Sequence, residues 1–169
     1  LDGIPIYSYE MLHKIVDQDT VFIAASGFPE TRSDAVRKLE ALIKKPTFAT
    51  IIHTSAVIFP EVKIQSGVFI AANSTLAIGS EIEQHAIINQ NVSFGHDCFL
   101  GTYSVISPGC VISGRTHIDR ESFLGSNTVT YPGVNIGEKC KISILSVISR
   151  SVKPMKKVMA KPNLMIFDM

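Results

Sequence analysis

The sequence has almost no net charge, few cysteines and no long apolar run. Its 16 lysines and arginines nearly balance its 15 aspartates and glutamates, so the charge does not indicate a polyanionic nucleic-acid partner. No stretch reaches the roughly 20 apolar residues that a membrane-spanning helix needs, and no signal peptide opens the chain. We therefore expect no nucleic-acid partner and no membrane span, and the cytoplasm is the expected compartment.

In place of those features the sequence has a six-residue repeat. A large apolar residue occupies sixteen of seventeen successive sixth positions, where the 46% hydrophobic composition predicts about eight. The seventeen positions are Ile52, Ile58, Ile64, Ile70, Leu76, Ile82, Ile88, Phe94, Leu100, Ile106, Ile112, Ile118, Leu124, Thr130, Ile136, Ile142 and Ile148. The residue two before each is always Ala, Ser, Thr, Cys or Val. This period predicts a parallel β-helix in which each hexad is a short strand and a turn.

Three hexads per coil would give a triangular cross-section that repeats every eighteen residues. Large side chains would then stack about 4.8 Å apart in the interior, with the small ones at the corners. The pattern resembles the left-handed β-helix of hexapeptide-repeat acyltransferases. The left hand is implied by that resemblance, because parallel crossovers are usually right-handed. Seventeen hexads predict between five and six coils.

Glycines, asparagines and cysteines occupy fixed places in the hexads. The residues that follow a core position by three are Gly67, Asn73, Gly79, Asn91, Gly109, Asn127 and Gly133, and those that follow one directly are Gly95, Gly101, Gly125 and Gly137. We expect all of them at turns that tolerate a positive φ. Cys98, Cys110 and Cys140 take the small corner position on three different faces, which predicts buried thiols rather than a disulfide or a metal site.

The residues before the repeat alternate short predicted strands and helices. Strands are expected at residues 4–7 and 21–25, and helices at 8–16 and 30–45. The buried face of the second helix would consist of Ala35, Val36, Leu39, Leu42 and Ile43. Arg32 would be a solvated or capping charge. The alternation predicts a small α/β, Rossmann-like unit, incomplete because a Gly-rich phosphate-binding turn would precede residue 1.

We therefore expect a partial α/β sugar- or nucleotide-binding unit over residues 1–47, a left-handed β-helix over 48–150 and a C-terminal tail over 151–169. A basic run begins at the last residue of the expected β-helix and continues into the tail. It consists of Arg150, Lys153, Lys156, Lys157 and Lys161. This run is either a solvated tail or a site that attracts the phosphates of a coenzyme.

His96 has the most informative context of the five histidines. It follows the core residue Phe94 by two, so its imidazole should lie at a turn, and Asp97 beside it can orient the ring. Gly114 is eighteen residues further, directly above it in the next coil. A general base below a free N–H suits acyl transfer from a thioester, although a surface histidine on a turn is the alternative.

A zinc site is the other chemistry to consider. Hexapeptide-repeat carbonic anhydrases bind zinc through three histidines, two of them five residues apart. Here His85 and His96 are eleven apart, and His117 is three residues off the coil period from His96. We therefore expect no metal site.

Residues 48–56 and 95–101, together with the α/β unit, resemble the sugar acetyltransferases that include sialic acid O-acetyltransferases and nucleotide-amino-sugar N-acetyltransferases. The resemblance implies that His96 is the general base and that Asp97 tunes it. It also implies that the N–H of Gly114 faces the thioester carbonyl of acetyl-CoA.

Further site residues are implied in the same way. Gly27 and Asn89 would border the sugar, while Val105, Ser126 and Ile144, with Gly114, would border the coenzyme. Val105 stands where relatives often have a histidine, and Ile144 lies in a segment expected to be rich in small residues.

The expected activity is transfer of an acetyl group from acetyl-CoA to an amine or hydroxyl of a nucleotide-linked sugar, in the synthesis of bacterial surface glycans. The expected assembly is a homotrimer, since flat prism faces would otherwise expose Ile78, Ile87 and Tyr103. The alternatives are a non-catalytic module that binds a sugar or a partner and, third, a zinc-dependent carbonic anhydrase. An amine and a hydroxyl require the same base and donor, so the residues do not distinguish them.

Overall fold

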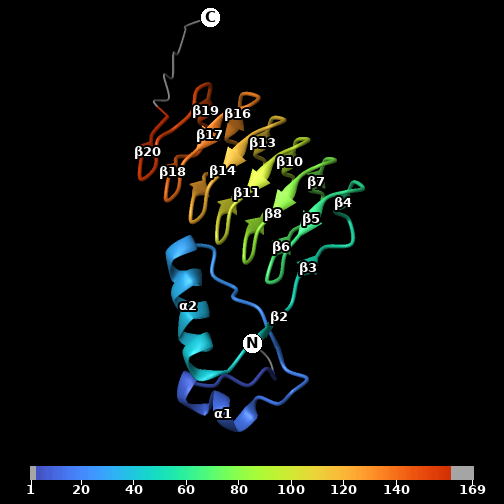
Figure 1. Ribbon diagram of the computed structural model, residues 1–169, viewed down its shortest axis with the longest axis vertical. Helices are drawn as coiled ribbons and strands as arrows, with labels where there is room; N and C mark the ends of the chain where they lie inside the picture. Colours follow the sequence, from blue (N-terminus) through green and yellow to red (C-terminus); the bar gives the residue numbers. More distant parts are fainter. Residues whose placement is uncertain (1–2, 161–169) are drawn as a thin grey trace, which may run out of the picture.

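The computed structural model describes residues 3–160, which form a left-handed parallel β-helix preceded by a small α/β unit (Figure 1). The predicted fold class is confirmed. Every strand of the β-helix is two residues long, and the strands stack into three faces, named here after the first strand of each. No helix within residues 3–160 combines the length and the apolarity that crossing a membrane requires.

The three faces contain all the strands of the β-helix. The β3 face consists of β3 (Ile51–Ile52), β6 (Phe69–Ile70), β9 (Ile87–Ile88), β12 (Val105–Ile106), β15 (Phe123–Leu124), β18 (Lys141–Ile142) and β20 (Lys157–Val158). The β4 face consists of β4 (Val57–Ile58), β7 (Thr75–Leu76), β10 (Ser93–Phe94), β13 (Val111–Ile112), β16 (Val129–Thr130) and β19 (Val147–Ile148). The β5 face consists of β5 (Lys63–Ile64), β8 (Glu81–Ile82), β11 (Phe99–Leu100), β14 (His117–Ile118) and β17 (Asn135–Ile136).

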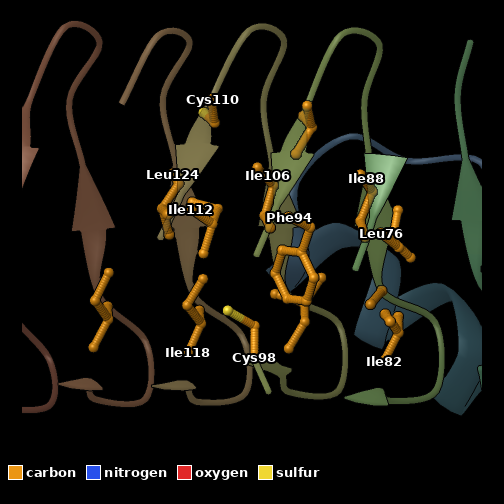
Figure 2. Close-up of a cluster of buried hydrophobic side chains, with 14 of the residues drawn as sticks. Leu76, Ile82, Ile88, Phe94, Cys98, Ile106, Cys110, Ile112, Ile118 and Leu124 are labelled. Atoms are coloured by element: carbon orange, nitrogen blue, oxygen red, sulfur yellow. The ribbon is translucent and has the colours of Figure 1, made fainter. Parts of the chain in front are cut away.

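The register confirms the coil of eighteen residues. Phe94 pairs with Ile112 on the β4 face, and Leu100 pairs with Ile118 on the β5 face. The predicted core column points inward, and its side chains from Ile70 to Ile148 are at most 3% exposed. Figure 2 shows ten of the packed core residues, with Cys98 and Cys110 among them. All three cysteines are buried and free, as predicted.

The corners of the prism follow two rules rather than the one expected. The glycines and asparagines three residues after a core position all have positive φ, for example 74° at Gly67 and 58° at Asn73. Gly95 and Gly101, which directly follow core residues, do not. A Cβ on Gly95 would lie 2.6 Å from the backbone nitrogen of Gly114, so this glycine permits a close approach of two coils rather than a left-handed turn.

The α/β unit is a β–α–β arrangement. Its elements are the 3₁₀ helix η1 (Tyr9–Met11), α1 (Leu12–Ile15), β1 (Val21–Phe22), α2 (Pro29–Leu42) and β2 (Thr47–Phe48). β1 and β2 pair in parallel, and α2 connects them. The strand predicted at residues 4–7 is wrong, because those residues pair with no described strand.

The buried face of α2 also differs from the expectation. Val36 and Leu39 are buried as predicted, whereas Leu42 is 53% exposed at the end of the helix. Arg32 is 1% exposed, so its assignment as a solvated charge is wrong.

The unit packs on the β3 face, and this covers residues expected at a subunit interface. Phe28 stacks on Phe123 with ring centroids 6.2 Å apart, and Glu30 pairs with Lys141 at 2.6 Å. Ile87 on the β3 face is consequently 9% exposed, whereas Ile78 on a turn remains 47% exposed.

The β-helix continues past residue 150, where we expected a tail to begin. Val152 bridges to Ile136, and β20 pairs with β18. Arg150, Lys153, Lys156 and Lys157 therefore belong to the last coil. Lys161, and the rest of the predicted tail to residue 169, lie outside the described residues.

Candidate active site

His96 lies on the turn that leads from the β4 face to the β5 face, an edge that we call the β4/β5 edge. Its side chain is 48% exposed, and Nδ1 lies 2.8 Å from Oδ2 of Asp97. Asp97 is in the left-handed region, with φ at 55°, which aspartate tolerates better than most residues. A carboxylate only accepts, so Asp97 favours the tautomer with the proton on Nδ1 and leaves Nε2 free to take a proton.

Gly114 lies directly over the imidazole, as the eighteen-residue period predicts. A Cβ on Gly114 would collide with Nε2 and would lie 2.6 Å from Cδ2 of His96. Below the pair, a Cβ on Gly79 would collide with Oδ1 of Asp97. The His96–Asp97 pair therefore sits between two glycines from the coils on either side, and no other residue type leaves it room.

The N–H of Gly114 is available to a ligand. It donates no hydrogen bond within residues 3–160, while the carbonyl of Gly114 accepts one from the N–H of Gly133 at 3.0 Å. The nearby thiol of Cys98 donates to the carbonyl of Ser113 at 3.2 Å, and burial raises its pKa. Cys98 is therefore a structural thiol rather than a nucleophile.

Gly27 and Asn89 line one cavity between the α/β unit and the β3 face, as expected of residues that border a sugar. The cavity has a volume of about 310 Å³. Its other walls are apolar and consist of Ile23, Ala24, Ala25, Ile51, Phe69 and Ile87. The side-chain amide of Asn89 donates to the carbonyl of Ile106 at 2.9 Å, which holds this side chain in place at the wall of the cavity.

Arg32 joins this cavity to the β-helix, a role that no pattern in the sequence indicates. Nε donates to the carbonyl of His85 at 2.8 Å, Nη1 donates to that of Ser26, and Nη2 donates to those of Tyr103 and Ser104. Burial lowers the pKa of the guanidinium to about 10. Arg32 thus joins the loop before Gly27 to two neighbouring coils.

His85 lies beside Arg32 in the same contact. Its ring stacks on Tyr103, with centroids 5.1 Å apart, and meets the edge of Phe48 at 4.5 Å. Nδ1 has no hydrogen-bond partner among the described residues. Burial, and then the charge of Arg32, lower the pKa of His85, so the ring is neutral in this contact at pH 7.

Of the residues expected to border the coenzyme, Gly114 lies over His96, and the other three lie apart from it. Val105 is 1% exposed on the β3 face under the α/β unit, so a coenzyme contact through its side chain is contradicted by its burial. Ser126 and Ile144 lie one coil apart on the turns that lead from the β3 face to the β4 face, an edge that we call the β3/β4 edge. The whole β4 face separates that edge from His96.

A second histidine–aspartate pair provides a comparison within the chain. Nε2 of His117 lies 3.0 Å from Oδ1 of Asp119 on the β5 face, and the His117 ring stacks on Phe99. The His117 ring has no glycine over it, since Asn135 is its partner in the next coil. Within residues 3–160 no three His, Cys, Asp or Glu residues gather closely enough to hold a metal ion.

Comparison with known proteins agrees with this architecture. The family model for the hexapeptide repeat of succinyl-transferase matches residues 115–143. No curated protein sequence matches the chain.

Three solved structures show the likeness over most of the chain. PerB from Caulobacter crescentus, in complex with CoA and GDP-perosamine, is 27% identical, with a TM-score of 0.82 over 90% of this chain and 72% of that one. A mutant of perosamine N-acetyltransferase from the same organism is 26% identical, with a TM-score of 0.83 over 95% and 74%. The acetyltransferase domain of PglB from Neisseria gonorrhoeae, in complex with acetyl coenzyme A, shares the fold, with 24% identity and a TM-score of 0.88 over 96% and 78%.

The three stacked faces place this chain in the left-handed β-helix fold class, and the hexapeptide-repeat model matches its residues 115–143. Within that class its structural relatives are the sugar acetyltransferases, which confirms the resemblance seen in the sequence.

Proposed function

We propose that the protein is an acetyl-CoA-dependent acetyltransferase that acts on an amine or hydroxyl of a nucleotide-linked sugar. The observation that carries the proposal is the His96–Asp97 pair directly beneath Gly114, whose N–H donates no hydrogen bond within residues 3–160. PerB, which shares the fold at 27% identity, is described with CoA and GDP-perosamine bound. Bacterial surface glycans are the setting in which such acetylated sugars are used.

The geometry supports a direct transfer. Nε2 of His96 takes the proton of the acceptor as its nitrogen or oxygen attacks the acetyl carbon, and Asp97 stabilises the imidazolium that forms. The N–H of Gly114 holds the oxyanion of the tetrahedral intermediate. When the carbon–sulfur bond breaks, the imidazolium returns its proton to the thiolate of CoA. The reaction therefore requires no metal.

The position of the two subsites supports a homotrimer. His96 is on the β4/β5 edge, whereas the Gly27–Asn89 cavity opens on the β3 face, so one chain does not bring them together. The β4 face between them carries no charged residue on its outward strand positions, which are Val57, Thr75, Ser93, Val111, Val129 and Val147. A flat uncharged face of this kind suits contact with another copy.

Cyclic packing through the β4 face would bring the β4/β5 edge of one copy beside the β3/β4 edge of the next. The base and the oxyanion donor would then come from one chain, and the acceptor cavity from its neighbour. Ser126 and Ile144 would line the coenzyme path from that second edge. Arg150 lies two coils above Gly114 on the β4/β5 edge, where its charge would attract the phosphates of the coenzyme. The free cysteines fit the reducing cytoplasm.

The test is an acetylation assay on the whole chain with acetyl-CoA and a panel of nucleotide-linked sugars that offer either an amine or a hydroxyl. CoA release and the acetylated product are measured. We expect His96→Ala to lower turnover by about 10³-fold, since a general base contributes roughly 10²–10⁴. His117→Ala is the matched control, because it removes the other aspartate-paired histidine, and it should retain full activity. Turnover of His96→Ala within a few-fold of wild type would remove this mechanism.

One observation favours the non-catalytic alternative. Ile144 and Leu145 are 61% and 62% exposed at the turn where the coenzyme is expected, and their bulk narrows that path. Sugar binding without any acetyl-CoA-dependent product, measured by calorimetry in the same panel, would establish a binding module instead.

A further inference from the structure

Thr130 breaks the regularity of the β-helix one coil above the proposed active site. It is the polar exception among the seventeen core positions, yet it is 1% exposed. The ladder is disturbed at this point. β13 and β16 keep only the pair Val111 and Val129, whereas the neighbouring pair of β10 and β13 keeps both of its residue pairs.

The cause is a substituted hydrogen-bond acceptor. The N–H after each core residue normally donates to a backbone carbonyl of the next coil, as Gly95 does to Ile112 at 2.8 Å. Ser113 is the exception between His53 and Ser143. Its N–H donates to Oγ1 of Thr130 at 3.0 Å.

A closed ring of three hydrogen bonds results. Oγ1 of Thr116 donates to the carbonyl of Ser113 at 2.6 Å and lies 3.1 Å from Oγ1 of Thr130. Each hydroxyl has one proton, so Thr130 donates to Thr116, Thr116 donates to the Ser113 carbonyl, and the Ser113 N–H donates to Thr130. Both hydroxyls and both backbone groups of Ser113 are satisfied in a buried setting.

This ring acts on the proposed oxyanion donor through one rigid unit. The carbonyl of Ser113 and the N–H of Gly114 belong to the same planar peptide, so fixing the first fixes the direction of the second. Donation to the carbonyl by Thr116 and by the thiol of Cys98 also polarises the peptide, which makes its N–H a stronger donor.

We propose that Thr130 is a positioning residue that aims the Gly114 N–H at the thioester carbonyl over His96. The inference rests on the proposed function. Without the hydroxyl, the Ser113 N–H either loses its acceptor or moves to the backbone carbonyl of residue 130, as in the other coils. Either change redirects the Ser113–Gly114 peptide.

The test compares three variants in the assembled protein. Thr130→Val has the same shape without the hydroxyl, Thr130→Ile restores the regular core pattern, and Thr130→Ser keeps the hydroxyl. We expect kcat to fall about tenfold for Val and Ile, which is part of the 10²–10³ lost with a whole oxyanion donor. KM for both substrates should stay within twofold, and Ser should retain kcat. Ser122→Ala removes a buried hydroxyl that bonds the carbonyl of Gly137 on another edge, and it should leave kcat unchanged.

A spectroscopic signal separates aiming from a merely structural role. Infrared spectra of bound acetyl-CoA labelled with ¹³C at the acetyl carbonyl should show that band at a lower frequency than in solution, and Thr130→Val should reduce the shift. If His96→Ala is inactive while Val and Ile keep the wild-type kcat and carbonyl band, the role of Thr130 is overturned and the proposed function stands. If His96→Ala is fully active, the proposed mechanism fails, and if the wild-type protein acetylates no sugar in the panel, the proposed function fails.

Discussion

The β-helix is stabilised by contacts that repeat from coil to coil, whereas the α/β unit is attached by a few individual contacts. In the β-helix each coil repeats the contacts of the one below, and core side chains such as Ile70 and Ile106 are fully buried. The α/β unit has strands of two residues and buries few side chains of its own, Val36 and Leu39 among them. Its attachment depends on individual contacts, of which the buried Arg32 makes the most hydrogen bonds.

The two regions therefore differ in how exactly they position a residue and in how easily they can change by substitution. A repeated ladder fixes the proposed catalytic pair and its proposed donor with backbone hydrogen bonds. A unit held by a small number of side chains can change its acceptor cavity without altering the ladder. A substitution that disrupts one of the two regions can be followed by its effect on the other.

The largest effect is expected when a defect in the α/β unit and a defect in the β-helix are placed in different chains of one oligomer. A Cβ on Gly27 meets open space, so Gly27→Trp should fill the acceptor cavity, and this variant and His96→Ala should each be inactive. Co-expression of the two should restore measurable acetylation, because the proposed trimer, when mixed, would contain a site with one intact cavity and one intact base. The assay is turnover of the purified mixed oligomer.

The control for that experiment mixes two defects of the same region. His96→Ala with Asp97→Asn should stay at the level of the separate variants, since every site in the mixture then has a damaged edge. No restored activity in the first mixture would show that each chain works with its own two regions, whereas restored activity in the control would show that the gain does not come from a shared site.

The second largest effect is expected from a side chain placed between position 114 and the imidazole of His96. Gly114→Ala places a methyl group against the imidazole, and we expect about a 10²-fold loss in kcat because the donor and the base are both displaced. Overpacking should also cost about 1–2 kcal/mol of unfolding free energy. Chemical unfolding should show that this cost disappears in the His96→Ala background, where the methyl group has room. Equal costs in both backgrounds would place the clash elsewhere.

Loosening the α/β unit should give a smaller and more selective effect. Arg32→Met leaves the carbonyls of Ser26, His85 and Tyr103 without donors, which we expect to cost about 3 kcal/mol of attachment. KM for the acceptor should rise about tenfold because the loop before Gly27 is released, while KM for acetyl-CoA stays constant. Steady-state kinetics and limited proteolysis measure the two effects.

Arg37→Met is the matched control on the same helix. Its pair with Asp34 is exposed, at 67% and 58% of the two side chains, so its loss should change stability and kinetics very little. An equal rise in both KM values for Arg32→Met would indicate general damage instead.

The smallest effect should be a pH dependence of the attachment. The pKa of His85 is lowered in the folded chain by burial and by Arg32, with Phe48 and Tyr103 against its ring. The unfolded state therefore binds the proton more readily. The stability contributed by the neutral ring is complete above about pH 6.5 and decreases as the pH falls below that value toward the folded-state pKa.

His85→Asn should flatten this slope, measured by thermal unfolding between neutral and mildly acidic pH. Asparagine tolerates the positive φ of 58° at this position, so the backbone should be preserved. An unchanged slope would assign the pH dependence to another group.

The two regions also differ in how far the sequence predicts them. Position in the hexad determines position in space, so the place of Gly114 over His96 followed from counting eighteen residues. Arg32 was misjudged because a helix position does not reveal which carbonyls lie across from it. The same packing hides Val105 and Ile87, which a bare prism would have exposed. Thr130 departs from the six-residue pattern, but its role depends on the directions of hydroxyl groups, which that pattern does not determine.

Because glycines lie above and below the proposed catalytic pair, the number of residues between them affects the geometry of the proposed site. Gly79, the His96–Asp97 pair and Gly114 come from three successive coils, so they align only while the segments between them keep their number of residues. In most enzymes a surface loop absorbs an inserted residue. Here one insertion between residues 79 and 114 would move every later position away from its partner. This segment can therefore evolve by substitution but not by insertion or deletion.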